Sequence, residues 1–211
     1  LLHSFLSGVS NQRTDRYGGS RENRMRHPLE VAAAVRREWP DNLPAFFRLS
    51  AIDGLPEGWL MEDALVFSKE LGRLGYDVID CSSGGIDADR SRSVATALTR
   101  RPGFQVPFAE EIRKELKMMT MAVGLIVDPR QAEEILRSGH ADLIAIGRES
   151  PVNPHWTYHA ACVLDDPAAQ SLLPDPYGYW LNRRGKLDPW RAGEHSLPSP
   201  AESFATENAS A

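Results

Sequence analysis

The sequence contains little cysteine and no long apolar run. Cys81 and Cys162 are the two cysteines among 211 residues, and they match neither a disulfide framework nor the clustered Cys/His spacing of a zinc site. We therefore expect both to be reduced packing residues and expect no metal site. No stretch approaches the roughly 18 to 20 apolar residues that cross a bilayer, and the N-terminus lacks the basic-then-apolar order of a secretory signal. These absences predict a cytoplasmic protein with no membrane partner.

Basic residues are scarce relative to acidic ones. The chain has 24 Lys and Arg against 29 Asp and Glu, which gives a formal net charge of -5. Binding to a phosphate backbone needs a concentrated basic face, so this balance disfavours nucleic acid as a partner. The apolar share of 42% is enough for one domain with a buried core. Small molecules or proteins are the expected ligands.

The sequence also lacks a recognisable beginning. It opens LLHSFLSGVSNQRTDRYGG, without an initiator Met and with an apolar run typical of the middle of an element. We interpret the chain as a fragment of a longer protein.

Helical and strand patterns alternate along most of the chain. Residues 1–19 and 86–106 are expected to be loops. The helical period and its end signals, with Ser20 and Asp128 as N-caps and Gly139 as a C-terminal stop, predict helices over 20–39, 61–75, 107–117, 128–139 and about 153–164. Short apolar runs predict strands over 45–50, 76–83, 119–126 and 141–147. These strands are continuously apolar, which predicts parallel βα units whose strands are covered on both faces.

Four parallel βα units cannot close a barrel. A (β/α)₈ barrel needs eight units and about 250 residues, so we predict an α/β fold that is the C-terminal half of such a barrel over residues 1–165. The alternative, an open doubly wound sheet, should carry a G-x-G-x-x-G turn after its first strand, and none is present. A proline-rich C-terminal extension is expected over 166–185 and a disordered tail over 186–211.

Glycines end the third and fourth predicted strands. Gly124 and Gly147 would lie where barrels commonly bind phosphate, and Arg148 would add a charged contact beside them. Turn glycines beside a surface arginine would give the same pattern. The residues alone therefore leave a phosphate site and a purely structural role both open.

Arg48 is unusual because it lies in a predicted core strand. Burying a guanidinium without a partner is costly, so Arg48 must meet an anion or several acceptors at the end of the strand. A salt bridge with Asp80 and a ligand-facing cation are the two interpretations.

Six segments, which follow one another in the same order as in a known family, carry a resemblance across about residues 1–160. They read SNQRTDRYGGSRENRMR (10–26), FRLSAIDG (47–54), DCSSGG (80–85), PGFQVPFAEEIRKE (102–115), VGLI (123–126) and ADLIAIGRE (141–149). The chain resembles the Old Yellow Enzyme family of FMN-dependent ene-reductases, in particular the xenobiotic reductase and thermophilic-like class. The segment PYGYWLNRRG (176–185) is similar to the end of the xenobiotic-reductase branch.

The resemblance implies where a flavin would bind. Arg48 matches the arginine at the flavin pyrimidine edge, while Gly124, Gly147 and Arg148 match the loops that hold the FMN phosphate. Trp156 and Trp180 match aromatic residues at the substrate pocket, the second reaching it from a neighbouring subunit, which implies a homo-oligomer. Simple hydrophobic packing is the alternative for both tryptophans.

The resemblance also implies which residues this chain does not contain. The His/His or His/Asn pair that binds the substrate carbonyl and the Tyr that donates a proton are expected upstream of Leu1, so no catalytic residue is assigned. His3 is not a member of that pair, and Tyr17 is expected to pack its loop.

The implied activity is an NAD(P)H-dependent, FMN-mediated hydride transfer to an α,β-unsaturated carbonyl, an enone-type small molecule. One alternative is a catalytically inactive barrel remnant that serves as a binding or assembly piece. Another is a different phosphate-binding barrel enzyme, such as a lyase or isomerase.

Overall fold

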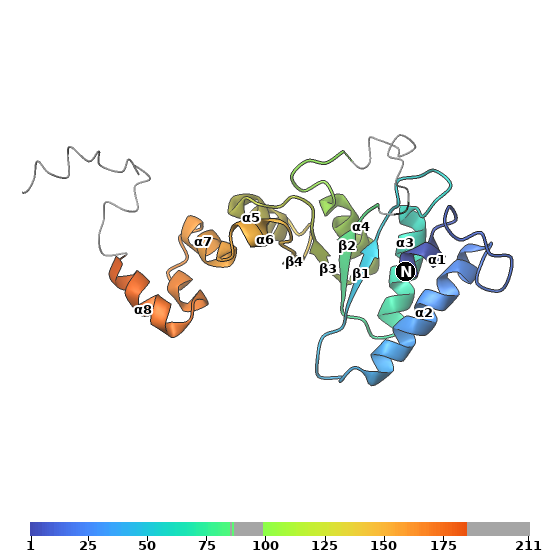
Figure 1. The fold of residues 1–211 in the computed structure, drawn as a ribbon, viewed down its shortest axis with the longest axis horizontal. Helices are drawn as coiled ribbons and strands as arrows, with labels where there is room; N and C mark the ends of the chain where they lie inside the picture. Colours follow the sequence, from blue (N-terminus) through green and yellow to red (C-terminus); the bar gives the residue numbers. More distant parts are fainter. Residues whose placement is uncertain (85, 87–98, 185–211) are drawn as a thin grey trace, which may run out of the picture. The chain divides into compact units, whose positions relative to one another are not determined.

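The computed structural model describes residues 1–84, 86 and 99–184 (Figure 1). It divides the chain into two compact units, of which the first covers Leu1–Trp156 and the second begins at Thr157. The elements are α1 (Leu2–Leu6), α2 (Arg21–Glu38), β1 (Phe46–Ser50), α3 (Met61–Arg73), β2 (Val78–Ser82), α4 (Val106–Leu116), β3 (Met119–Ala122), α5 (Pro129–Arg137), β4 (Leu143–Ile144), α6 (Glu149–Val152), α7 (Trp156–Val163), the 3₁₀ helix η1 (Ala169–Leu172) and α8 (Asp175–Arg184). No helix among these described residues is long and apolar enough to cross a membrane.

The first unit contains one parallel sheet. Its strand order is β1-β2-β3-β4, and every neighbouring pair is parallel. Helix α3 packs on β1, α4 packs on β2 and β3, and α5 packs on β4 (Figure 1). Four parallel strands in sequential order with connecting helices are half of the strand set of a (β/α)₈ barrel, which confirms the predicted fold class.

The predicted helix ends are mostly confirmed. The Ser20 side chain accepts a hydrogen bond from the Asn23 N–H at the start of α2, and Asp128 accepts one from Arg130 at the start of α5. Gly139 follows α5 with a φ of +72°, which suits a glycine stop. The prediction of a loop over 1–19 is wrong at its start, where α1 forms, and α6 was not predicted.

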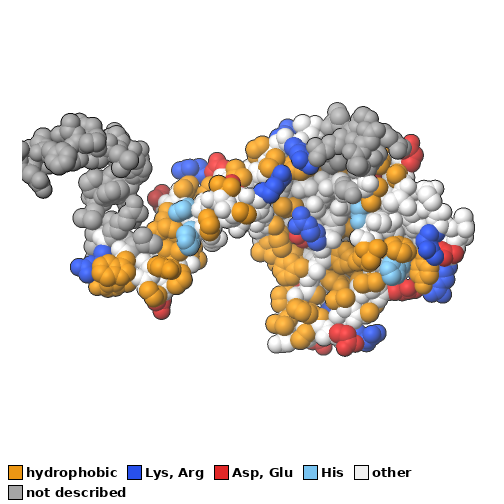
Figure 2. Space-filling model, viewed as in Figure 1, with side chains coloured by type: hydrophobic (Ala, Val, Ile, Leu, Met, Phe, Trp, Pro, Cys, Tyr) orange, Lys and Arg blue, Asp and Glu red, His pale blue; other side chains and the backbone are white. Residues whose placement is uncertain are grey.

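The prediction of strands buried on both faces is confirmed for β2, where Val78, Ile79, Asp80 and Cys81 are all buried. It is wrong for β1, β3 and β4, where helices cover one face and the opposite face carries exposed residues. The covered face carries Leu49, Ile79 and Cys81, each at most 2% exposed, in the core under the helices. The opposite face carries Phe46 and Met119, which are 44% and 49% exposed. Figure 2 shows hydrophobic side chains gathered on the first unit over the sheet. In a closed barrel this uncovered face would be the interior.

One polar arrangement occurs twice at the amino ends of the strands. Asp77, just before β2, accepts a hydrogen bond from the Ala45 N–H at 2.7 Å, and Asp142, just before β4, accepts one from the Thr120 N–H at 2.9 Å. A helical arginine then binds a turn carbonyl beside each aspartate: Arg36 donates to Gly75, and Arg113 donates to Gly139, both at 3.0 Å. Each aspartate thereby ties the start of its own strand to the strand before it.

The second unit is helical among its described residues. It contains η1 and α8 and most of α7. The predicted domain boundaries at 165 and 185 stay predictions, and the predicted disordered tail (186–211) lies outside the described residues.

Candidate functional site

A cavity of about 480 Å³ lies at the carboxyl ends of the four strands. Its lining comes from β1, from the end of β2, from the segments that follow β2, β3 and β4, and from the loop before α4. The lining residues are Arg48, Ser82, Ser83, Arg100, Phe104, Gln105, Val123, Gly124, Leu125, Ile126, Val127, Ala145, Gly147, Arg148 and Glu149. The four residues predicted to bind a cofactor, far apart in sequence, therefore line one cavity at the end of the sheet where parallel α/β folds bind ligands.

Arg48 is held by an ion pair on the uncovered face of the sheet. Its Nη1 donates to Asp80 Oδ2 at 2.8 Å, and its Nη2 donates to Ser82 Oγ at 3.4 Å. Two expectations are corrected: the Arg48 side chain is 57% exposed rather than buried, and it lies in the middle of β1 rather than at its end. The solvated guanidinium avoids most of the desolvation cost that made a buried one improbable. The ion pair with Asp80 is present, and the same side chain also lines the cavity.

Asp80 is the less exposed partner of this pair. Its side chain is 13% exposed, and burial raises its pKa while the Arg48 charge and hydrogen bond act in the opposite direction. Asp80 therefore holds the Arg48 guanidinium in position, while the guanidinium itself stays exposed to solvent.

Gly124 is required by the backbone. Its φ is +121°, and a Cβ added there would lie 2.9 Å from Gln105 Oε1 and 3.2 Å from Phe104 Cδ1. The Gly124 carbonyl also accepts a hydrogen bond from the Gly103 N–H at 2.8 Å. Only glycine adopts this conformation without strain, so Gly124 has a structural role as well as a place in the cavity wall.

Gly147 has no such structural requirement. A Cβ added there would meet no atom within 4 Å, so that space belongs to the cavity. Arg148 follows it directly, and no described carboxylate pairs with Arg148 or with Arg100. Open space at Gly147 together with the guanidinium groups of Arg148 and Arg100 suits a phosphate group, and Glu149 is the acid among the lining residues. The residues present therefore fit the phosphate end of a flavin nucleotide.

Sequence reasoning missed Arg100, Ser82, Ser83 and Gln105, which also line the cavity. A signal was present for the serines, because they are the last two residues of the predicted buried strand 76–83. Gln105 had no comparable signal, since its position depends on how the loop before α4 folds against β2.

The two tryptophans predicted at a substrate pocket have different surroundings. Trp156 Nε1 donates to the Val127 carbonyl at 2.9 Å, and its ring packs against the core. Trp180 is 65% exposed on α8 of the second unit, with its ring 5.3 Å from that of Tyr179. Their place at a substrate pocket stays a prediction.

The thiols differ from each other. Cys81 is fully buried in β2, and burial together with the nearby Asp80 raises its pKa to about 12. Cys162 is exposed on α7, so its predicted packing role is wrong. No group of three or more metal-ligating side chains occurs in the part of the chain that the structure describes.

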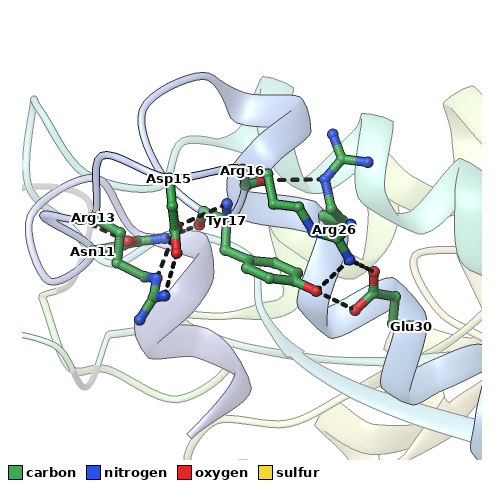
Figure 3. Close-up of polar contacts among 7 residues, drawn as sticks. All are labelled: Asn11, Arg13, Asp15, Arg16, Tyr17, Arg26 and Glu30. Carbon is green, nitrogen blue, oxygen red and sulfur yellow. Dashed lines mark hydrogen bonds and ion pairs between the residues drawn. The ribbon is translucent and has the colours of Figure 1, made fainter.

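The first of the segments that carry the resemblance, residues 10–26, forms a structural network rather than part of the cavity (Figure 3). Tyr17 OH donates to Glu30 of α2 at 3.2 Å, and the Asn11 side chain donates to the Tyr17 carbonyl at 2.7 Å. Arg26 of α2 donates to the Arg16 carbonyl at 3.0 Å. These contacts fold the loop onto α2, as expected for Tyr17.

Comparison with protein families decides the relationship. The model of the NADH:flavin oxidoreductase / NADH oxidase family matches residues 1–166. The chain belongs to this family. Among curated relatives, NADPH dehydrogenase of Geobacillus sp. (strain WCH70) is 47% identical over 161 residues, which are 76% of this chain and 45% of that protein. NADPH dehydrogenase of Bacillus subtilis (strain 168) is 45% identical over 179 residues, covering 85% of this chain and 49% of that protein. The chain spans about half the length of these relatives.

Solved structures share the fold. A 2-naphthoyl-CoA reductase complex aligns with a TM-score of 0.65 and 25% identity, over 77% of this chain and 24% of that one. The Old Yellow Enzyme homologue from Zymomonas mobilis aligns with a TM-score of 0.57 and 24% identity, over 79% of this chain and 44% of that one.

Proposed function

We propose that the chain supplies the flavin-phosphate half of an FMN-dependent NAD(P)H oxidoreductase of the ene-reductase type, and that it corresponds to the C-terminal half of the barrel. The observation that carries this proposal is the single cavity lined by Arg48, Gly124, Gly147 and Arg148 at the carboxyl ends of the strands. Family membership over residues 1–166 supports it.

The residues divide the cavity into two ends. At the β4 end, the space at Gly147 admits a phosphate and the Arg148 guanidinium binds it through charge-assisted hydrogen bonds. At the β1 end, Arg48 presents a positive charge that Asp80 holds in place. A fixed cation there favours negative charge on the ring system of a bound ligand.

The chemistry that FMN supplies when bound is hydride transfer from NAD(P)H to the β-carbon of an enone-type substrate. In this proposal the His pair that orients the substrate carbonyl and the Tyr that protonates the α-carbon are not among these 211 residues. Trp156 and Trp180 border the substrate pocket of a cytoplasmic homo-oligomer, in which a neighbouring subunit contributes Trp180.

A chimaera tests the proposal. The part of the Bacillus subtilis NADPH dehydrogenase that precedes the matched segment is joined to this chain, and FMN content and enone-dependent NADPH oxidation are measured. We expect a yellow protein that oxidises NADPH in the presence of 2-cyclohexenone, and we expect Arg148→Ala to weaken FMN binding by about tenfold or more. A folded chimaera that binds no FMN would overturn the proposal.

A catalytically inactive barrel remnant is the alternative. It is favoured by one outcome of the same experiment: a folded chimaera that binds FMN as tightly as the parent enzyme and shows no enone reduction.

A further inference from the structure

Gln105 is a buried polar side chain in the cavity wall. It is 5% exposed and lies at the N-terminal boundary of α4. Its Nε2 donates to Ser83 Oγ at 2.7 Å and, more weakly, to Ser82 Oγ at 3.4 Å. Ser82 Oγ accepts a second hydrogen bond, from Arg48 Nη2 at 3.4 Å.

These contacts determine what the two hydroxyls can do. An amide Nε2 and a guanidinium are donors only, so each serine oxygen acts as an acceptor toward them. Each hydroxyl still carries one hydrogen, and no acceptor for either hydrogen is found among the described residues. Both serines line the cavity. The two hydroxyl hydrogens are therefore available to donate to an acceptor atom of a ligand in the cavity.

We propose that Gln105 is a positioning residue that makes Ser82 and Ser83 hydrogen-bond donors to a bound ligand. With Arg48 they form a donor-only row at the β1–β2 end of the cavity, which selects a ligand group rich in acceptors, such as a carbonyl oxygen beside a ring nitrogen. This inference rests on the proposed function, under which that group is the pyrimidine part of the flavin.

The row is separate from the phosphate end. Ser82 ends β2, whereas Gly147 and Arg148 follow β4, two strands away in the sheet. Neighbouring strands lie about 4.8 Å apart, so the two ends are separated by roughly 10 Å. A change at the serines should therefore affect riboflavin and FMN alike and leave phosphate recognition unchanged.

The test uses the chimaera described above and flavin fluorescence anisotropy with riboflavin and with FMN. Gln105→Glu is close to isosteric, but the introduced carboxylate accepts hydrogen bonds and so turns both hydroxyls away from the cavity. We expect it to weaken riboflavin binding by about tenfold, and Ser83→Ala alone to weaken it by about threefold, as for hydrogen bonds between neutral groups. Riboflavin is neutral, so repulsion between the introduced carboxylate and a phosphate does not contribute. Gln12→Glu, at an exposed residue outside the cavity, is the charge-matched control and should bind riboflavin as the unsubstituted chimaera does.

A double-mutant cycle isolates the mechanism. If Gln105 acts through the serines, Gln105→Glu should have no further effect in the Ser82→Ala/Ser83→Ala background. An undiminished effect in that background, or unchanged riboflavin binding by Gln105→Glu or by Ser83→Ala, would overturn the inference while the proposed function stands. Circular dichroism establishes that each variant is folded. If the folded chimaera binds neither flavin, the proposed function itself fails and takes this inference with it.

Discussion

Two glycines in one cavity wall differ in what they do. Gly124 has a left-handed backbone and close neighbours, whereas Gly147 has an ordinary backbone and open space beside it. The sequence pattern treated them as equivalent, because both follow apolar strands. The difference arises from the loop before α4, which places Gln105 and Phe104 against Gly124 alone.

Alanine substitution should separate these two roles. Gly124→Ala is expected to lower the free energy of unfolding by about 1 to 3 kcal/mol, because it imposes strain and a contact with Gln105. Gly147→Ala should change stability by less than about 0.5 kcal/mol and still weaken FMN binding, because its methyl group occupies cavity space. Urea unfolding and flavin titration of both variants measure this. Equal stability losses would contradict the distinction.

The cysteines should react very differently. The Cys81 thiol is buried with its pKa raised to about 12, so it carries almost no thiolate at neutral pH. Cys162 is exposed. A colorimetric thiol reagent at pH 8 should modify one thiol in the native chain and two in denaturant. Rapid modification of two native thiols would show that Cys81 is accessible.

Asp80 should make stability depend on pH. Burial raises its pKa above the ordinary 3.8, and Arg48 opposes this shift. The folded state therefore binds a proton more readily than the unfolded state, and the stability contributed by this group is lost as pH rises from 3.8 through the raised folded value. Asp80→Asn removes that dependence, so the melting temperature of the variant relative to the parent should increase over this range. A relative melting temperature that decreases with rising pH would show the opposite sign.

At the scale of elements, the repeated aspartate arrangement joins neighbouring βα units. Asp77 and Asp142 each satisfy a backbone N–H that belongs to the preceding strand or its start. Both N–H donors belong to buried residues, since Ala45 is 7% exposed and Thr120 is fully buried. Removing the acceptor leaves a buried donor unpaired.

Alanine at either aspartate should therefore be destabilising. We expect Asp77→Ala and Asp142→Ala each to cost about 1 to 3 kcal/mol in urea unfolding. The control is Asp41→Ala, because the Asp41 side chain is 99% exposed and its ion pair with Arg36 contributes little. A loss at Asp41 as large as at Asp142 would show that the effect is one of charge rather than of strand pairing.

The sequence predicts these elements better than it predicts their exposure. Helix ends at Ser20 and Asp128 depend on local hydrogen bonds, so they could be read from residue type alone. The apolar runs predicted strands correctly, but β4 is only Leu143–Ile144 because the chain after it turns into the cavity wall. Exposure depends on what covers the sheet, which no local pattern specifies. The same holds for Arg48, whose place on the uncovered face decides that it is solvated.

At the scale of the molecule, the four-stranded sheet has two open edges as well as an uncovered face. Among the strands of the described residues, β1 pairs with β2 alone and β4 pairs with β3 alone. Phe46, Met119 and Leu143 are 44%, 49% and 36% exposed. Unpaired strand edges beside exposed apolar side chains are the usual route to association between chains.

We therefore expect the 211-residue chain to self-associate when it is expressed alone. Light scattering after size exclusion at tens of micromolar should give a mass well above the 23.4 kDa of one chain. Met119→Glu places a charge on the uncovered face and should shift the mass toward that of a monomer. Leu172→Glu, at a residue that is 50% exposed in η1 and not in the sheet, is the matched control and should leave the mass unchanged. If the parent chain is monomeric, or if the two variants reduce association equally, then the uncovered sheet face is not the surface through which the chains associate.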